Sequence, residues 1–200
     1  QCICGIAVSC HAPIIVNIVT NLSGIFTYAL RENEIVPLSK EMQSIQNYLE
    51  IMQIRFAGAF ECEIDVPPGL MRQKMTKMIL QPLVENAVYH GLEKAGRGTL
   101  RVTAREQDAC LLVDIWNNGV PIPPEKLEKL QKILGNKSAL QTESIRHKKI
   151  GIANTCWRIK LIFGDEYGLS IDSSAENGTL VSLRVPRIDL DEEENRLSFL

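Results

Sequence analysis

The sequence predicts an α+β protein in which a helical hairpin is followed by one mixed β-sheet that carries helices on one of its faces. Three observations predict this class. Apolar residues recur every three or four positions over 15–29 and over 38–56, which is typical of amphipathic helices. Over 60–66 apolar and acidic residues alternate strictly, which indicates a half-buried strand. Beyond that point helical patterns and hairpin strands are mixed along the chain, as in an α+β sandwich.

The helices before residue 58 are expected to form a hairpin and a connector. Residues 1–8 have the pattern of the end of a helix, residues 9–12 supply a turn, and Pro13 suits the first turn of the next helix. Together they predict two antiparallel helices. A further helix follows Pro37, with Ser39 as its expected N-cap.

A second unit is expected from Gly58 onward, because the strand pattern begins there. The predicted division is residues 1–57 as helices, residues 58–188 as the sandwich and residues 189–200 as an acidic, disordered tail. The polar stretch 135–149 lacks periodicity and is predicted to be a mobile lid. Within the sandwich we expect helices over 73–91, after 123–124 and over 150–163, and strands over 99–106, 110–116, 169–173 and 179–185.

Composition and charge exclude some classes of protein. The chain has 200 residues, of which 45% are hydrophobic and 23% charged, with a formal net charge of -2 and a pI of about 6.0. Without a basic stripe, a direct nucleic-acid partner is not expected. No uninterrupted apolar run reaches the roughly 18 residues that cross a bilayer, and no basic leader follows Gln1. The chain itself is therefore expected to be soluble and untargeted.

The cysteines are scattered along the chain without a repeated C-x-x-C spacing. This distribution argues against a disulfide framework or a zinc site and favours free thiols in a reducing compartment. Cys2, Cys4, Cys10 and His11 lie near one another in sequence, which leaves a metal cluster as an alternative. A crowded helix end is the interpretation that we prefer.

The run LQPLVENAVYHG places three polar residues, Glu85, Asn86 and His90, on the expected helix 73–91. Asparagine is a weak helix former, and the neighbours of Asn86 are apolar, so its amide needs a partner. An amide oxygen is a good ligand for a hard divalent cation. The alternative is that these side chains are simply solvated on a helix face.

Two further segments have the character of ligand-binding loops. In DIWNNGVPIP an apolar strand ends in the sharp turn Asn117-Asn118-Gly119. In KIGIANTCWRIKLIFG a helix begins at Gly151 directly after the basic stretch 146–149, and a helix N-terminus beside positive charge is suited to binding an anion. Each segment taken alone is also compatible with an ordinary turn or a solvated loop.

The order and spacing of these three segments, with Gly178-Thr179 before the last strand, resemble the N, G1 and G2 boxes of the GHKL (Bergerat-type) ATP-binding fold. Upstream, the run EIVPLSKEMQSIQNYLEIMQIRF resembles the segment that joins the dimerisation helices to the ATP-binding domain in sensor histidine kinases of the LytS/YesM type. The two resemblances together cover residues 1–186.

The resemblance implies an ATP- and magnesium-dependent protein-histidine kinase of a two-component system. It implies a homodimer held together by residues 1–57, and transfer of the phosphoryl group to an aspartate of a response-regulator receiver domain. A membrane sensor would lie upstream, so this chain would be the cytoplasmic portion of an inner or plasma membrane protein. The phosphate-accepting histidine would precede Gln1 in a P-H-F-L-x-N motif. His11 lies at a turn without that motif and is not expected to replace it.

The resemblance also assigns roles to individual residues. Asn86 would coordinate the magnesium ion that bridges the ATP phosphates, and Glu85 and His90 would act beside the triphosphate as catalytic residues. Further residues are expected to bind the nucleotide: Asn117, which takes the place of the adenine-recognising aspartate, Gly119, which would allow the base to approach closely, Lys149, Gly151, Asn154 and Thr179.

Several residues depart from the family pattern. Asn117 replaces an aspartate, Pro121 and Lys149 replace glycines, and Tyr89 stands where a basic residue is frequent. A neutral hydrogen bond is about half as strong as a charge-assisted one, so we expect ATP affinity to be weaker by about 1 kcal/mol rather than lost.

These departures leave two alternatives open. The first is a degenerate nucleotide-binding dimerisation scaffold without kinase activity. The second is a GHKL ATPase of the gyrase or chaperone type. Against the second, Pro82 occupies the position of the catalytic glutamate in those enzymes.

Overall fold

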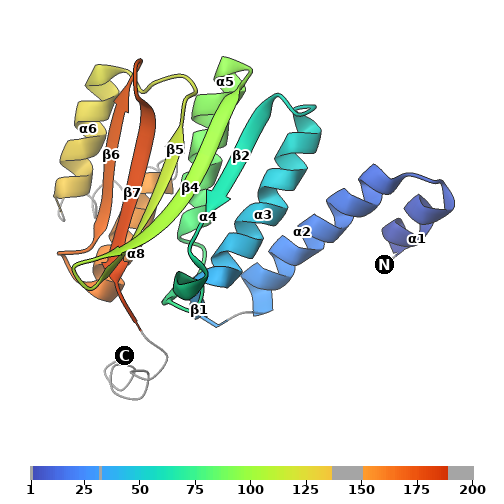
Figure 1. Cartoon of the computed structure of the whole chain (residues 1–200), viewed down its shortest axis with the longest axis horizontal. Coiled ribbons are helices and arrows are strands. Elements are labelled where there is room, and N and C mark those ends of the chain that lie inside the picture. The colour runs from blue at the N-terminus through green and yellow to red at the C-terminus, as the bar shows by residue number, and fades with distance from the viewer. Residues whose placement is uncertain (1, 32, 137–150, 189–200) are drawn as a thin grey trace.

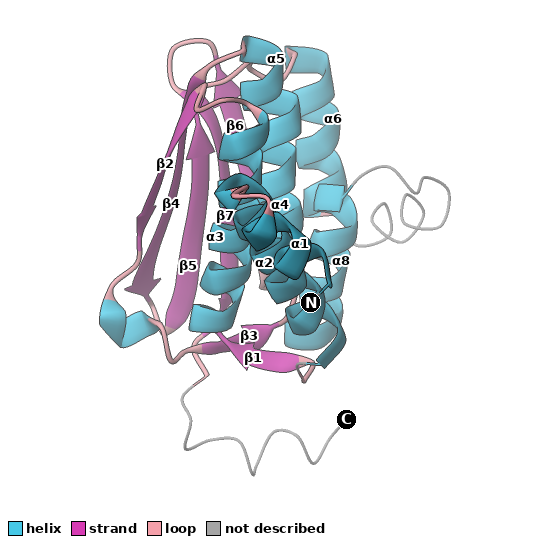
Figure 2. Cartoon of the chain, turned by 90° about the vertical axis from the view of Figure 1, so that its right-hand side faces the viewer, coloured by secondary structure: helices cyan, strands magenta, loops and turns pink. Residues whose placement is uncertain are grey.

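The computed structural model describes residues 2–31, 33–136 and 151–188. Most of the chain forms a two-layer sandwich, with a five-stranded sheet in one layer and helices in the other (Figures 1 and 2). The strands lie in the order β2 (Phe60–Asp65), β4 (Gly98–Gln107), β5 (Cys110–Asn117), β7 (Gly178–Pro186) and β6 (Gly168–Ser174). β2 is parallel to β4 and the remaining pairs are antiparallel. The predicted α+β class with a mixed sheet is confirmed.

The helical layer covers one face of this sheet (Figure 2). Its main helices are α3 (Leu38–Arg55), α4 (Leu80–Asn86), α6 (Pro124–Gly135) and α8 (Gly151–Phe163). α4 runs on without a break into a π-helical turn, η2 (Ala87–Leu92), and a short α5 (Glu93–Ala95), which ends where Gly96 adopts a left-handed conformation with φ of 72°. Glycine is favoured at that helix end because it has no Cβ to clash.

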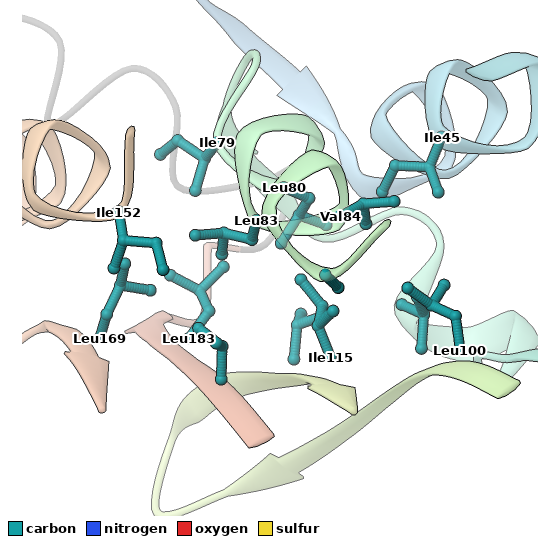
Figure 3. Close-up of a cluster of buried hydrophobic side chains, with 14 of the residues drawn as sticks. Ile45, Ile79, Leu80, Leu83, Val84, Leu100, Ile115, Ile152, Leu169 and Leu183 are labelled. Carbon is teal, nitrogen blue, oxygen red and sulfur yellow. The ribbon is translucent and has the colours of Figure 1, made fainter. Parts of the chain in front are cut away.

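The core lies between the two layers. Alternate residues of each strand point toward the helices, so that Leu100, Ile115 and Leu183 have no solvent exposure. Figure 3 shows Leu83 of α4 facing Ile115 and Leu183, with Ile152 of α8 at one side of this cluster. Burial of a side chain of this size stabilises the fold by about 1.5–3 kcal/mol. The sheet is therefore held to the helices by the apolar faces that the periodicity predicts.

An antiparallel helical hairpin precedes the sandwich, as the sequence predicts. It consists of α1 (Cys2–Ser9) and α2 (Pro13–Arg31), and α2 packs along α3. His11 has a φ of 53° and lies in the turn between the two helices. Figure 1 shows the hairpin extending from the side of the molecule that carries α3.

The start of α4 corrects two expectations. The helix begins at Leu80 and not near residue 73, because Lys74–Thr76 forms strand β3, which pairs with β1 (Ile35–Pro37). Ser39 is not an N-cap, because α3 begins at Leu38. The N–H groups of Leu38 and Ser39 donate instead to the carbonyl oxygens of Gln73 and Met71, at 2.7 and 3.0 Å. A chain segment distant in sequence therefore satisfies the free N–H groups that a side-chain cap would otherwise bind.

Helix α2 also corrects the expectation that no segment of the chain is long and apolar enough to cross a membrane. Residues 13–30 form a helical window with a mean hydropathy of 1.5, of which 6% is buried, and this is long and apolar enough to cross a membrane by length and composition alone. This window is not an uninterrupted apolar run, because asparagine, threonine and serine stand between its apolar residues. Core helices and signal sequences can pass the same test.

The predicted lid, apart from Gly135 and Asn136, and the predicted tail lie outside the described residues. All six cysteines carry free thiols. Among the described residues, no group of three or more histidine, cysteine, aspartate or glutamate side chains is placed to hold a metal ion.

Candidate functional site

A cavity of about 230 Å³ lies between the helical layer and the inner face of the sheet. Its wall combines the α4–η2 helix, the segment that leads into α6, the start of α8, and the strands β5, β6 and β7. The apolar part of the wall consists of Leu83, Ala87, Gly91, Val120, Pro121, Ile122, Pro123, Leu130, Ile152, Ile171 and Val181. The polar part consists of Asn86, His90, Lys94, Asn117, Lys126 and Thr179. A mostly apolar cavity with a few convergent polar groups is typical of a small-molecule site.

Asn86 presents an amide oxygen at the helical wall. Its Nδ2 atom donates to the carbonyl oxygen of Pro82 one turn earlier, at 2.6 Å. This bond fixes the amide, and in the described part of the chain the Oδ1 atom has no donor of its own. Gly151 of α8 lies alongside, since a Cβ built on it would be 3.3 Å from Nδ2 of Asn86. Two of the three sequence motifs therefore meet here.

Asn117 lies at the end of β5 and is only 2% exposed. Its Oδ1 atom accepts from the backbone N–H of Gly119 at 3.1 Å. The remaining motif, DIWNNGVPIP, thus contributes a buried amide to the cavity wall.

The turn that follows Asn117 packs directly on the helix of the first motif. A Cβ on Gly119 would lie 2.2 Å from the carbonyl carbon of Gly91, and one on Gly91 would lie 2.2 Å from Oδ1 of Asn117. The N–H of Val120 donates to the Gly91 carbonyl at 3.0 Å. Gly119 was expected to let a base approach, whereas here it lets the backbone of Gly91 approach and is not itself in the cavity wall.

Positive charge gathers at the helical side of the cavity. Burial lowers the pKa of His90 below its usual value of 6.5, and the charges of Lys126 and Lys94 lower this pKa further. His90 is therefore mostly neutral near pH 7, and the two lysines carry the charge.

Sequence reasoning missed both of these lysines. Asn86, His90 and Lys94 follow one another in steps of four residues, a spacing that keeps side chains on one face of a helix. Lys94 could therefore have been found from the sequence. Lys126 reaches the cavity from α6, which packs on β6 and α8, and no sequence pattern indicates those contacts.

The other expected site residues are distributed as follows. Thr179 is in the wall, opposite Asn117 in the β5–β7 ladder, and its hydroxyl bonds that of Ser173 at 2.7 Å. Glu85 and Asn154 are not in the wall. Glu85 accepts from Nε2 of Gln81 at 3.0 Å. Lys149, the remaining expected site residue, lies outside the described residues.

Glu85 is close enough to Tyr48 of α3 to affect its ionisation. Burial raises the pKa of Tyr48, and the neighbouring Tyr89 and Glu85 raise this pKa further. Tyr48 lies on α3, and no residue of α3 is in the cavity wall. Consecutive helical residues point about 100° apart, so Glu85 and Asn86 do not face the same space.

The fold is a two-layer sandwich with a mostly apolar cavity between its helices and its sheet. The chain belongs to the histidine kinase-, DNA gyrase B-, and HSP90-like ATPase family, whose model matches residues 72–189. Residues 3–60 match the histidine kinase family model. The resemblance to sensor histidine kinases with a GHKL domain is thereby confirmed.

Individual relatives agree with this assignment. The chain is 31% identical over 162 residues to the sensor protein LytS of Bacillus subtilis, which covers 80% of this chain and 26% of LytS. It is 29% identical over 171 residues to the sensor protein kinase HptS of Staphylococcus aureus, covering 84% of this chain and 32% of HptS. The chain thus spans about a quarter to a third of the length of these curated relatives.

Solved histidine kinases share the fold at low sequence identity. The Acinetobacter baumannii histidine kinase AdeS has a TM-score of 0.54 at 12% identity, covering 88% of this chain and 80% of AdeS. The histidine kinase ThkA, in complex with the response regulator protein TrrA, has a TM-score of 0.51 at 21% identity, covering 93% of this chain and 52% of that one.

Proposed function

We propose that this chain is the ATP-binding catalytic part of a sensor histidine kinase, which phosphorylates a histidine that precedes Gln1 in the intact protein. The observation that carries the proposal is the cavity itself. Its wall is mostly apolar and holds the buried amide of Asn117, and it also carries Asn86, His90 and two lysines. Apolar walls suit a flat base, and the lysine charges suit a polyphosphate.

Asn86 fits the role of a magnesium ligand. Its Nδ2 atom is held by the Pro82 carbonyl, so the free Oδ1 atom is the hard oxygen that Mg²⁺ prefers. Magnesium, when bound, neutralises the charge on the phosphate oxygens. Lys94 and Lys126 would hold the triphosphate, neutral His90 would lie beside it, and Asn117 and Thr179 would bound the base.

Gly151 is proposed to support the same phosphates from α8. It adjoins Asn86, and the N-terminal N–H groups of a helix are suited to binding anions. The roles expected for Glu85, Asn154 and Lys149 remain predictions. Glu85 has to turn away from Gln81 to reach a phosphate from its present position.

Residues 1–57 are proposed to form a homodimer that places the catalytic part beside its phosphate-accepting helix. We propose further that the phosphoryl group passes to an aspartate of a response regulator, since ThkA, which shares the fold, forms a complex with one. The membrane sensor expected upstream and a cytoplasmic location for the catalytic part belong to the same proposal.

Thermal melting with and without Mg-ATP tests this function. Ligand at about 100 times its dissociation constant stabilises a protein by roughly 2.7 kcal/mol, and each kcal/mol raises the melting temperature by about 2–4 °C for a chain of this size. We expect a shift of several degrees that requires magnesium and is lost in Asn86→Ala. Asn177→Ala is the matched control, because this asparagine of the β6–β7 turn is exposed and is not part of the cavity wall.

Melting and phosphate labelling together separate the alternatives. If saturating Mg-ATP raises the melting temperature of neither the parent chain nor Asn177→Ala, the kinase proposal is wrong and the dimerisation scaffold without nucleotide chemistry takes its place. If ATP binds and radiolabelled phosphate then appears on His11, the proposal that the acceptor lies outside this chain is wrong.

A further inference from the structure

The turn between β3 and α4 holds a residue other than glycine in the left-handed region. Met78 has a φ of 56° and lies two positions before Leu80, the first residue of α4. A side chain with a Cβ disfavours this conformation. Such strain persists only where the surrounding groups fix the backbone, and it is frequent at clamps and switch regions. The groups that hold this turn therefore determine its conformation.

The N–H groups of the turn are bonded to α2 and α3. The N–H of Met78 donates to the carboxylate of Glu41 on α3, and also to the hydroxyl oxygen of Tyr28 on α2, at 3.3 Å. The next two N–H groups, of Ile79 and Leu80, donate to the other oxygen of Glu41 at 3.1 and 2.8 Å. The Tyr28 hydroxyl itself donates to Glu41. Tyr28 is 6% exposed, so the helical hairpin takes part in this network through a buried group.

The carbonyl groups of the same turn are bonded to α8. The guanidinium of Arg158 donates to the carbonyl oxygens of Lys77 and Met78, at 3.2 and 3.3 Å. Arg158 also forms an ion pair with Glu34, at 3.2 Å, and the carbonyl of Glu34 accepts from the N–H of Lys77 at 2.9 Å. Glu34 lies between α2 and β1. The turn is thus held through its N–H groups by α2 and α3, and through its carbonyl groups by α8.

This turn leads directly into the helix that carries Asn86. α4 has seven residues, begins at Leu80 and ends at Asn86, and it packs on both α3 and α8. Gly151, the first residue of α8, adjoins the Asn86 amide. A short helix is stiff, and stiff elements carry a displacement from one end to the other. The conformation of the turn therefore sets the position of Asn86.

We propose that Lys77–Met78 is a joint through which the hairpin, packed on α3, positions Asn86 for magnesium, and that Tyr28 and Arg158 are its positioning residues. This inference rests on the proposed function, in which Asn86 holds the magnesium ion of a bound nucleotide. Loss of either contact lets Met78 relax toward an ordinary conformation and lets the start of α4 move with it. Only the fraction of molecules with the turn in place is then competent, and the affinity falls by that fraction.

Isothermal titration with Mg-ATP measures the contribution of the hairpin. Tyr28→Phe removes only the hydroxyl, and we expect it to weaken binding about fivefold or more. Asn21→Ala is the matched control. Asn21 also bonds α2 to α3, through Glu50 at 2.8 Å, but its bond does not involve the turn. This control should change the affinity by less than about twofold, although it too loosens the hairpin.

The same titration measures the contribution of α8. Arg158→Met frees the two carbonyl groups of the turn and should also weaken Mg-ATP binding about fivefold or more. Because this change removes a positive charge, a charge control is needed. Lys160→Met removes a charge from the same helix at a residue that donates to the carbonyl of Asp165, at 2.9 Å. Its affinity should stay within about twofold of the parent.

A glycine at position 78 distinguishes positioning from a general loss of stability. Glycine adopts the left-handed region without strain, so the turn would keep its conformation with fewer bonds. Met78→Gly alone should bind Mg-ATP at least as tightly as the parent. Combined with Tyr28→Phe, it should recover most of the lost affinity. A tyrosine that only stabilised the fold would not be replaced by a glycine fifty residues away.

The outcomes separate this inference from the function on which it rests. Unchanged affinity in Tyr28→Phe and Arg158→Met overturns the inference and leaves nucleotide binding intact, and so does a loss that Met78→Gly does not restore. If Mg-ATP binds to neither the parent nor Asn21→Ala, the proposed function is overturned as well.

Hydrogen exchange in the parent decides if the variants do not fold, which circular dichroism checks. Coupling between two sites is reciprocal, so bound Mg-ATP has to tighten the joint in turn. The amides of residues 78–80 should then exchange more slowly by about fivefold or more. Exchange at these amides that Mg-ATP leaves unchanged, while the nucleotide binds, overturns the inference.

Discussion

The sandwich and the helical hairpin use their apolar residues in opposite ways. In the sandwich, α4 buries Leu80, Leu83 and Val84 completely against the sheet and its neighbouring helices. In the hairpin, α1 buries only Ala7, and large apolar side chains stay exposed along both helices. These are Ile3, Ile6, Val8, Ile14, Ile15, Leu22, Phe26 and Leu30. The sandwich therefore buries its large apolar side chains within itself, whereas the hairpin leaves an apolar surface that is suited to a partner.

Self-association is where this comparison predicts the largest effect. We expect the chain to be a two-fold dimer in solution, with a mass about twice 22.4 kDa, because a second hairpin would cover the exposed apolar surface. Light scattering measures this mass. Phe26→Lys, which places a charge on a side chain that is 57% exposed, should give a monomer that keeps its fold. Lys132→Glu on the exposed face of α6 is a control and should stay dimeric. A parent chain that is monomeric at micromolar concentration would contradict the prediction.

Truncation of one leucine in each region sharpens the same contrast. Leu83 is fully buried, so Leu83→Ala should lower the free energy of unfolding by about 2–5 kcal/mol. Leu30 is 81% exposed, and Leu30→Ala should change it by less than about 0.5 kcal/mol in dilute monomer. Urea denaturation of both variants in the Phe26→Lys background gives the comparison without dimerisation. An equal loss of unfolding free energy in the two variants would mean that Leu30 of the hairpin is packed as Leu83 of the sandwich is.

The two regions meet at Glu41 of α3, which is 1% exposed. Its carboxylate accepts from the hydroxyl of Tyr28 on α2 and from the N–H groups of Met78, Ile79 and Leu80, where α4 begins. One side chain therefore joins the hairpin to the helix that carries Asn86. It also provides the cap that the start of α4 needs.

We expect Glu41→Gln to destabilise the fold by about 1–3 kcal/mol, because an NH₂ group would then face donors in a buried site. Glu50→Gln on the same helix is the matched control. Glu50 accepts from Nδ2 of Asn21 in a half-buried position, where an amide oxygen can still accept, so the change should be less than about 0.5 kcal/mol. Melting temperatures of the two variants measure the difference. If both lose the same stability, Glu41 does not act as the cap.

The sequence predicts a segment's secondary structure well where neighbouring residues determine it, and poorly where residues distant in sequence determine it. The spacing over 15–29 and 38–56 and the alternation over 60–66 each reflect one buried face, and the structure has helices and a strand there. The predicted start of α4 was wrong. The apolar spacing continues through 74–76, but pairing with residues 35–37 makes that segment a strand. Distant pairing overrides local pattern, and no periodicity reports it.

In the site, too, some features were predicted from the sequence and others depend on contacts between distant segments. The resemblance led us to expect Asn86, Asn117 and Thr179 together, and all three are in the cavity wall. That Gly119 faces Gly91, and that the Asn117 oxygen is used by the turn, depend on how close two backbones come, which the sequence does not state. Lys126 enters through the packing of α6 on β6 and α8.

The smallest predicted effect concerns His90 and protons. Burial and the nearby Lys126 and Lys94 hold the pKa of His90 below 6.5 in the free protein, so it is mostly neutral there at pH 7. A bound triphosphate would offset the lysine charges and raise this pKa, so binding should take up protons below pH 6.5 and affinity should rise as the pH falls through that range. Calorimetry at pH 7.5 and 5.5 should show a severalfold gain for the parent chain over His90→Gln, under the tenfold that a full unit of pKa would give. The protonation of the ligand itself is common to both proteins and cancels in this difference. An identical pH dependence in the two would place the triphosphate away from His90, at the other end of the cavity.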